Sequence, residues 1–143
     1  MSTYVREKVL RIPRHKMNFA HIVRKLEEKF PGKDIMDDLG FYIEDAFPDL
    51  FDYGTVNKFQ LAPTEEWFID YVLDKEWDWD CDGEYGKVRD LYESEKEKFR
   101  PIFQQLDPDI NMDYVRLVEF CWYNGCEAPD YYDLQEDPFY KEL

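Results

Sequence analysis

The sequence predicts an α+β fold: a single, predominantly helical domain of about five helices with a small two- or three-stranded sheet. A chain of 143 residues suits one domain, which we assign to residues 1–143, and a chain of this size buries about two-thirds of its unfolded surface. Apolar residues recur mainly at helical spacing, and only two short segments read as strands. Aromatic residues make up 18% of the chain, which is enough to fill a core without disulfide bonds.

The first third of the chain predicts one strand followed by two helices. Residues 3–13 alternate well enough for a strand, which Pro13 ends. A helix capped by Asn18 should follow and stop at Pro31, and a second helix should run from Asp34 to Pro48. The apolar positions of the first helix are Phe19, Ile22, Val23, Leu26 and Phe30.

The remaining elements are predicted from turn residues and helical spacing. Residues 55–62 lie between a glycine and a proline, so we expect a short strand paired with the first one. Helices are expected from Thr64 through Val72, over residues 88–106, and from Asp109 or Asn111 to Trp122. Because Pro101 lies inside the second of these patterns, that helix should kink or restart near Arg100.

The net charge of −15 is distributed unevenly along the chain. Residues 1–33 form a basic N-terminal segment with nine basic and three acidic residues, a net charge of +6. The other 110 residues hold nine basic and thirty acidic residues, a net charge of −21, and they include an acidic, aromatic C-terminal tail at residues 127–143. Such a body repels nucleic acid and anionic membranes and attracts basic protein surfaces. We expect the basic segment to compensate the acidic body internally.

Several functional classes lack the residues that they need. No apolar run approaches the roughly 18 residues that span a bilayer. Three cysteines without an export signal indicate reduced thiols in a cytoplasmic protein. Nucleophilic catalysis needs a serine, threonine or cysteine beside a base that a third group holds in place. Only His15 and His21 could act as a histidine base, and their spacing does not place them on one helix face. We therefore expect no enzyme, and a small enzyme with paired carboxylates is the second alternative.

The most informative stretch is residues 74–86, which reads D-K-E-W-D-W-D-C-D-G-E-Y-G. If it is extended, the period of two sends its carboxylates to one face and both tryptophans to the other. Imitation of a nucleic-acid backbone needs a second acidic row, which Asp70, Asp90, Glu93 and Glu97 or the C-terminal tail would supply. The predicted partner-binding residues are Asp74, Glu76, Trp77, Asp78, Trp79, Asp80, Asp82, Glu84 and Tyr85.

Part of this stretch also allows a metal-binding interpretation. Residues 78–83 are similar to the start of an EF-hand calcium loop, with Asp78, Asp80 and Asp82 at loop positions one, three and five and Gly83 at position six. The resemblance implies a divalent-cation module with calcium as its ligand, as the first alternative function. Apart from this calcium, we expect no cofactor.

The resemblance ends after about a dozen residues. Arg89 stands at the twelfth position, where the family has a bidentate glutamate, and Tyr85 stands at the eighth, where an aliphatic residue is usual. Asp90 or Glu93 would have to supply the missing ligand. A guanidinium at the ligand position weakens cation binding.

The sequence therefore favours a non-enzymatic acidic protein that blocks the basic, nucleic-acid-binding surface of a partner, such as a nuclease. Acidic nuclease inhibitors, including phage anti-defence proteins and immunity-type proteins, have this kind of composition. Competition would be steric and electrostatic, with Trp77, Trp79 and Tyr85 as interface anchors. The expected partners include no nucleic acid and no membrane.

Overall fold

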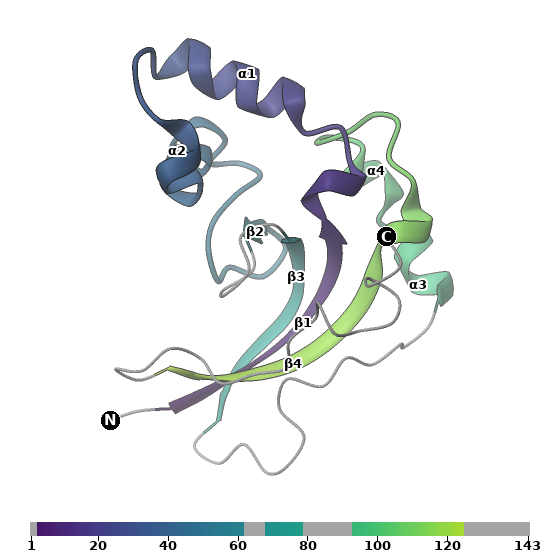
Figure 1. Ribbon diagram of the computed structural model, residues 1–143. Coiled ribbons are helices and arrows are strands. Elements are labelled where there is room, and N and C mark those ends of the chain that lie inside the picture. The colour runs from purple at the N-terminus through teal and green to yellow at the C-terminus, as the bar shows by residue number, and fades with distance from the viewer. Residues whose placement is uncertain (1–2, 62–67, 79–92, 125–143) are drawn as a thin grey trace.

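The computed structural model of the chain describes residues 3–61, 68–78 and 93–124. A four-stranded antiparallel sheet forms its centre, with strand order β2-β3-β1-β4 (Figure 1). Strands β1 (Thr3–Pro13), β3 (Phe68–Asp78) and β4 (Arg116–Asn124) are long, whereas β2 (Phe59–Leu61) is a three-residue edge strand.

The prediction of a predominantly helical domain with a small sheet is wrong, because the described sheet has four strands and three of them are nine residues or longer. Only α1 (Ala20–Lys29) and α2 (Leu39–Ala46) reach eight residues, whereas α3 (Glu93–Glu97) and α4 (Arg100–Phe103) are single turns. Short 3-10 turns η1 (Arg14–Lys16), η2 (Ile35–Asp38) and η3 (Met112–Tyr114) complete the described helical elements.

Two predicted helices are strands in the structure. Residues 68–72, assigned to a helix, begin β3, and most of the helix expected to end at Trp122 is β4. All five residues from 68 to 72 are buried, so this part of the strand contacts protein on both faces. A strand buried on both faces loses the alternation of apolar and polar residues, and its pattern then resembles that of a buried helix.

Other parts of the first third agree better with the prediction. The strand over residues 3–13 is confirmed, and helices occur after residues 18 and 34 as expected. However, the N-cap of α1 is Phe19 rather than Asn18, whose backbone N–H instead donates to Asp107 Oδ2 at 2.8 Å.

Among the later elements, the expected second strand differs from the prediction and the expected helix start near Arg100 agrees with it. The strand expected at residues 55–62 shortens to β2 and pairs with β3, not with β1. The helical restart near Arg100 is confirmed, because Pro101 lies in the first turn of α4, where no hydrogen bond needs its missing N–H.

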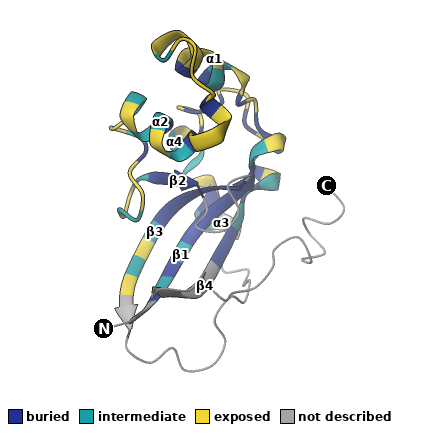
Figure 2. Ribbon diagram, turned by 60° about the vertical axis from the view of Figure 1, so that its left-hand side comes forward, coloured by how far each residue is buried: buried dark blue, intermediate teal, exposed yellow. Residues whose placement is uncertain are grey.

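The sheet is buried on both faces along much of its length (Figure 2). One face carries Leu10, Ile12 and Tyr71, which join a core with side chains from α1, α2 and α4. On the other face four valines form a second cluster, and the charged residues Glu7, Arg11 and Asp70 are also buried. The valines are Val5, Val9, Val72 and Val118.

A bulge changes the register near the end of β3. Lys8 of β1 pairs with Asp74 and Val9 pairs with Val72, so Leu73 is the extra residue. Beyond the bulge, Asp74 and Glu76 lie opposite Lys8 and Arg6 of β1. The bulge therefore sets which basic residues neighbour the first two carboxylates of the acidic stretch.

Candidate functional site

The structure describes only the beginning of the predicted acidic site. Residues 74–78 are extended, as one of the two predicted geometries requires, and Asp74 and Glu76 are exposed. Trp77 and Asp78 end β3. The other predicted positions, which include most of the calcium-like loop, lie outside the described residues; they are Trp79, Asp80, Asp82, Glu84 and Tyr85.

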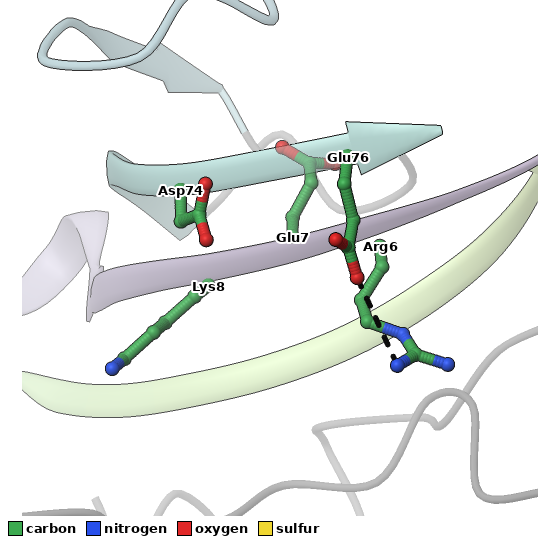
Figure 3. A pocket seen from close by; sticks show the side chains of 5 residues that line it. All are labelled: Arg6, Glu7, Lys8, Asp74 and Glu76. Atoms are coloured by element: carbon green, nitrogen blue, oxygen red, sulfur yellow. Dashed lines mark ion pairs between the residues drawn. The ribbon is translucent and has the colours of Figure 1, made fainter. Parts of the chain in front are cut away.

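Basic side chains accompany this first part of the acidic stretch. Arg6 Nη1 lies 3.8 Å from Glu76 Oε1, and Lys8 is the cross-strand neighbour of Asp74. Together with Glu7 these four residues line a pocket of about 200 Å³ (Figure 3). Figure 3 shows Glu7 directed away from Arg6 and Lys8, as alternation along a strand requires. The surface at this end of β3 is therefore of mixed charge.

The expected second acidic row does not include Asp70. This carboxylate is fully buried and accepts two hydrogen bonds from Arg11, so it cannot face a partner. Glu97 is exposed but forms an ion pair with Arg100 at 2.9 Å. Asp90 lies outside the described residues, and Glu93 begins α3.

A different acidic surface, which sequence reasoning missed, lies on and around α2. We call residues 34–56 the α2 acidic surface; they hold seven carboxylates and no lysine, arginine or histidine. Every large hydrophobic residue that is exposed in the described chain also belongs to this segment. These residues are Met36, Phe41, Tyr53 and Val56, and the carboxylates are Asp34, Asp37, Asp38, Glu44, Asp45, Asp49 and Asp52.

Helical spacing explains why Phe41 projects outward from α2. Leu39 and Ile43 are one turn apart and fully buried, so the residue midway between them lies on the opposite side of the helix. Tyr42 packs against Phe30 of the α1 end, with ring centroids 4.9 Å apart. Phe41 is left 61% exposed, and Figure 2 shows exposed residues along α2.

Carboxylates lie close to Phe41 on α2. Glu44 and Asp45 follow it by three and four residues, which places them on the same helix face. Asp38 is the N-cap residue of α2, one turn before Phe41. Glu44 Oε1 accepts the backbone N–H of Tyr53 at 2.6 Å, so this carboxylate holds the following loop to α2.

Two lysines beside this surface bind its backbone carbonyl groups and not its carboxylates. Lys29 Nζ donates to the backbone carbonyl of Asp45 at 3.4 Å, and Lys58 Nζ donates to that of Asp49 at 2.7 Å. Among the residues that the structure describes, no lysine or arginine forms an ion pair with a carboxylate of the α2 acidic surface. The negative charge of the segment is therefore uncompensated by contact pairs.

A buried polar network lies beneath the loop that follows α2. Arg11 Nε and Nη2 donate to the two carboxylate oxygens of Asp70 at 2.5 and 2.7 Å. Gln60 Nε2 lies 3.0 Å from Glu7 Oε1 and 3.5 Å from Asp70 Oδ2. All four side chains are at most 1% exposed and come from three neighbouring strands.

The loop at residues 52–57 connects this network to the α2 acidic surface. The Gly54 N–H donates to Gln60 Oε1 at 2.9 Å, while the adjacent Tyr53 N–H is held by Glu44. Partial burial, followed by the negative charges of Glu7, Asp70 and Glu44, raises the pKa of Tyr53 to about 12. Tyr53 thus anchors the loop to α2, and Gly54 anchors it to the buried network.

The network is better suited to fixing structure than to catalysis. Its two carboxylates are both buried, and each already has a hydrogen-bond donor from Arg11 or Gln60. Among the described residues, no group of three or more histidine, cysteine, aspartate or glutamate side chains is placed to hold a metal ion.

Comparison of the chain with protein-family models, with curated proteins and with solved structures finds no match. None of the described helices combines the length and the hydrophobicity that crossing a membrane requires. Functional inference therefore depends on the chemistry of the surfaces described above.

Proposed function

We propose that the protein is a non-enzymatic binding protein of the cytoplasm that occupies the basic, nucleic-acid-binding surface of a partner protein. One observation carries the proposal: the α2 acidic surface combines seven carboxylates, no basic residue and all the exposed large hydrophobic residues of the described chain. Carboxylates alone would serve solubility, but exposed aromatic rings beside them do not.

Charge and aromatic residues have separate tasks in this mechanism. Uncompensated carboxylates attract a basic surface over distance and raise the association rate, an effect that salt screens. Aromatic side chains provide most of the contact energy after encounter, because they bury large apolar areas with little loss of conformational entropy. Phe41 and Tyr53 are the proposed anchors, and the stretch at residues 74–86 is a second contact region.

A displacement assay tests the proposal with defined probes. The protein is titrated into complexes of fluorescent DNA with two basic proteins: an OB-fold single-stranded DNA-binding protein and a duplex-bending HU-type protein. We expect the protein to release the DNA from at least one probe. Its own dissociation constant for that probe, measured without DNA, should increase between about 50 and 200 mM salt.

Two variants with equal net charge separate a specific surface from general acidity. Asp38→Asn with Asp45→Asn removes two charges beside Phe41, whereas Asp109→Asn with Asp113→Asn removes two exposed charges elsewhere. The first pair should raise the midpoint about tenfold, a loss of about 1.4 kcal/mol, and the second should change it little. The proposal would be overturned if the protein released DNA from neither probe, or if both variants raised the midpoint equally.

A further inference from the structure

The arrangement of side chains on the α2 acidic surface indicates which kind of nucleic acid it imitates. Phe41 and Tyr53 are 61% and 48% exposed, and Glu44 accepts the backbone N–H of Tyr53. Asp38 and Asp45 flank the Phe41 ring from the preceding and following positions along the helix. The surface therefore presents an exposed aromatic ring among negative charges.

Single-stranded and duplex nucleic acids present different chemistry to a protein. A duplex stacks its bases inside and offers mainly rows of phosphates, so an imitator of its outer surface needs charges and no protruding ring. A single strand offers unstacked bases, which its binding proteins receive on aromatic platforms beside a basic groove that holds the phosphates. An exposed ring among carboxylates matches the second arrangement.

We infer that the α2 acidic surface docks onto the single-stranded nucleic-acid platform of a partner, with Phe41 in the place of a base and its neighbouring carboxylates in the places of phosphates. This inference rests on the proposed function and narrows the class of partner. Phe41 protrudes from a helix, so the partner contributes the receiving ring or pocket. The partner's lysines and arginines then lie opposite Asp38, Glu44 and Asp45.

A second copy of the chain is the competing occupant of this surface. The exposed side of the adjacent helix α1 carries Arg24, Lys25 and Lys29, which are complementary in charge to the carboxylates of α2. However, those three basic residues come with no exposed aromatic ring on α1, so a second copy offers Phe41 no stacking platform there. Charge complementarity alone would give a pairing that is insensitive to the ring at position 41.

The displacement assay with the two probes above distinguishes these possibilities. We expect the protein to release oligo(dT) from the OB-fold protein at a concentration at least tenfold lower than it needs to release duplex DNA from the HU-type protein. Phe41→Ala should raise the first midpoint about tenfold, because one stacked ring is lost. Phe41→Leu should be as weak as Phe41→Ala, whereas Phe41→Trp should retain wild-type competition. Gln105→Ala, which shortens an exposed side chain outside the α2 acidic surface, is the control.

Each outcome decides between the proposals. Release of duplex DNA alone would overturn the single-strand inference and leave the proposed function standing, whereas release from neither probe would overturn both. Wild-type competition by Phe41→Leu would show that apolar burial suffices and would overturn the imitation of a base. Dimerisation in sedimentation experiments that is lost in Asp38→Asn with Asp45→Asn would assign the surface to a second copy. Thermal melts of each variant confirm folding, which the exposure of Phe41 favours.

Discussion

At the scale of single residues, the most consequential contact is the buried pair of Arg11 and Asp70. Its two hydrogen bonds align the guanidinium with both carboxylate oxygens, a geometry that lysine cannot reproduce. Gln60 adds an amide on the other side of Asp70 and reaches Glu7 as well. These contacts fix the register of β2, β3 and β1 because only one pairing brings the partners together.

Removal of one member of this pair is expected to be costly. Asp70→Ala deletes the carboxylate that neutralises a guanidinium which is 1% exposed, and we expect the free energy of unfolding to fall by about 3–5 kcal/mol in urea denaturation. Replacing both members, as in Arg11→Met with Asp70→Leu, should recover part of this loss, since the buried guanidinium is removed together with its partner. A loss below about 1 kcal/mol in the single variant would contradict this account.

The sequence gives little indication that these residues are buried. Glu7 and Arg11 lie on the same side of β1 as Val5 and Val9, so alternation cannot separate a wet face from a dry one. The sequence likewise predicts an exposed carboxylate at Asp70, because charged residues are usually on the surface. Burial of a charge depends on a partner from another strand, and residues 11 and 70 are distant in sequence.

At the scale of elements, the sequence predicts local structure well where one face of an element is wet. The helices α1 and α2 follow signals of this kind, whereas the strand at residues 3–13 is predicted correctly although much of it is buried on both faces. β3 and β4 do not, because neighbouring residues such as Leu117 and Val118 are both buried. Long-range pairing with β1 overrides the apparent helical spacing of both segments.

The candidate surface on α2 was predictable in part. The absence of basic residues between Asp34 and Lys58 is visible in the sequence. However, the alternating pattern of residues 74–86 is the more regular acidic pattern, and it predicts a binding site there. The exposure of Phe41 depends on which side of the helix meets the core, and the bond between Glu44 and Tyr53 depends on a loop conformation. Neither follows from composition or spacing.

That loop conformation depends on Gly54, which has φ +74°. A Cβ atom at this position would lie 2.5 Å from Lys75 Nζ, whereas Gly32, with φ +78°, has no atom within 4 Å of the same position. Alanine in the left-handed region costs about 1–2 kcal/mol, so both substitutions should destabilise the protein. Gly54→Ala should lose more than Gly32→Ala in urea denaturation, because Lys75 must also move. An equal or larger loss for Gly32→Ala would show that the Lys75 contact contributes nothing.

At the scale of the whole molecule, the net charge of −15 links stability to the proposed function. Carboxylates without contact pairs repel one another in the folded chain more than in the expanded unfolded chain. On the α2 acidic surface this repulsion is concentrated around Phe41, where Asp38, Glu44 and Asp45 lie within one turn. The carboxylates that would attract a basic partner therefore destabilise the folded protein when no partner is bound.

Salt should therefore stabilise the free protein at neutral pH. The Debye screening length falls to about 8 Å at physiological ionic strength, so added salt weakens the repulsion between carboxylates. The thermal midpoint should therefore rise as sodium chloride increases from about 10 to 150 mM. The rise should disappear near pH 4.4, the isoelectric point of the sequence, where carboxylate repulsion is largely gone. Asp38→Asn with Asp45→Asn should raise the midpoint in low salt and reduce its salt dependence more than Asp109→Asn with Asp113→Asn. If the two pairs behaved alike, repulsion would be spread over the whole surface instead of concentrated at α2, and the carboxylates around Phe41 would have no special electrostatic role.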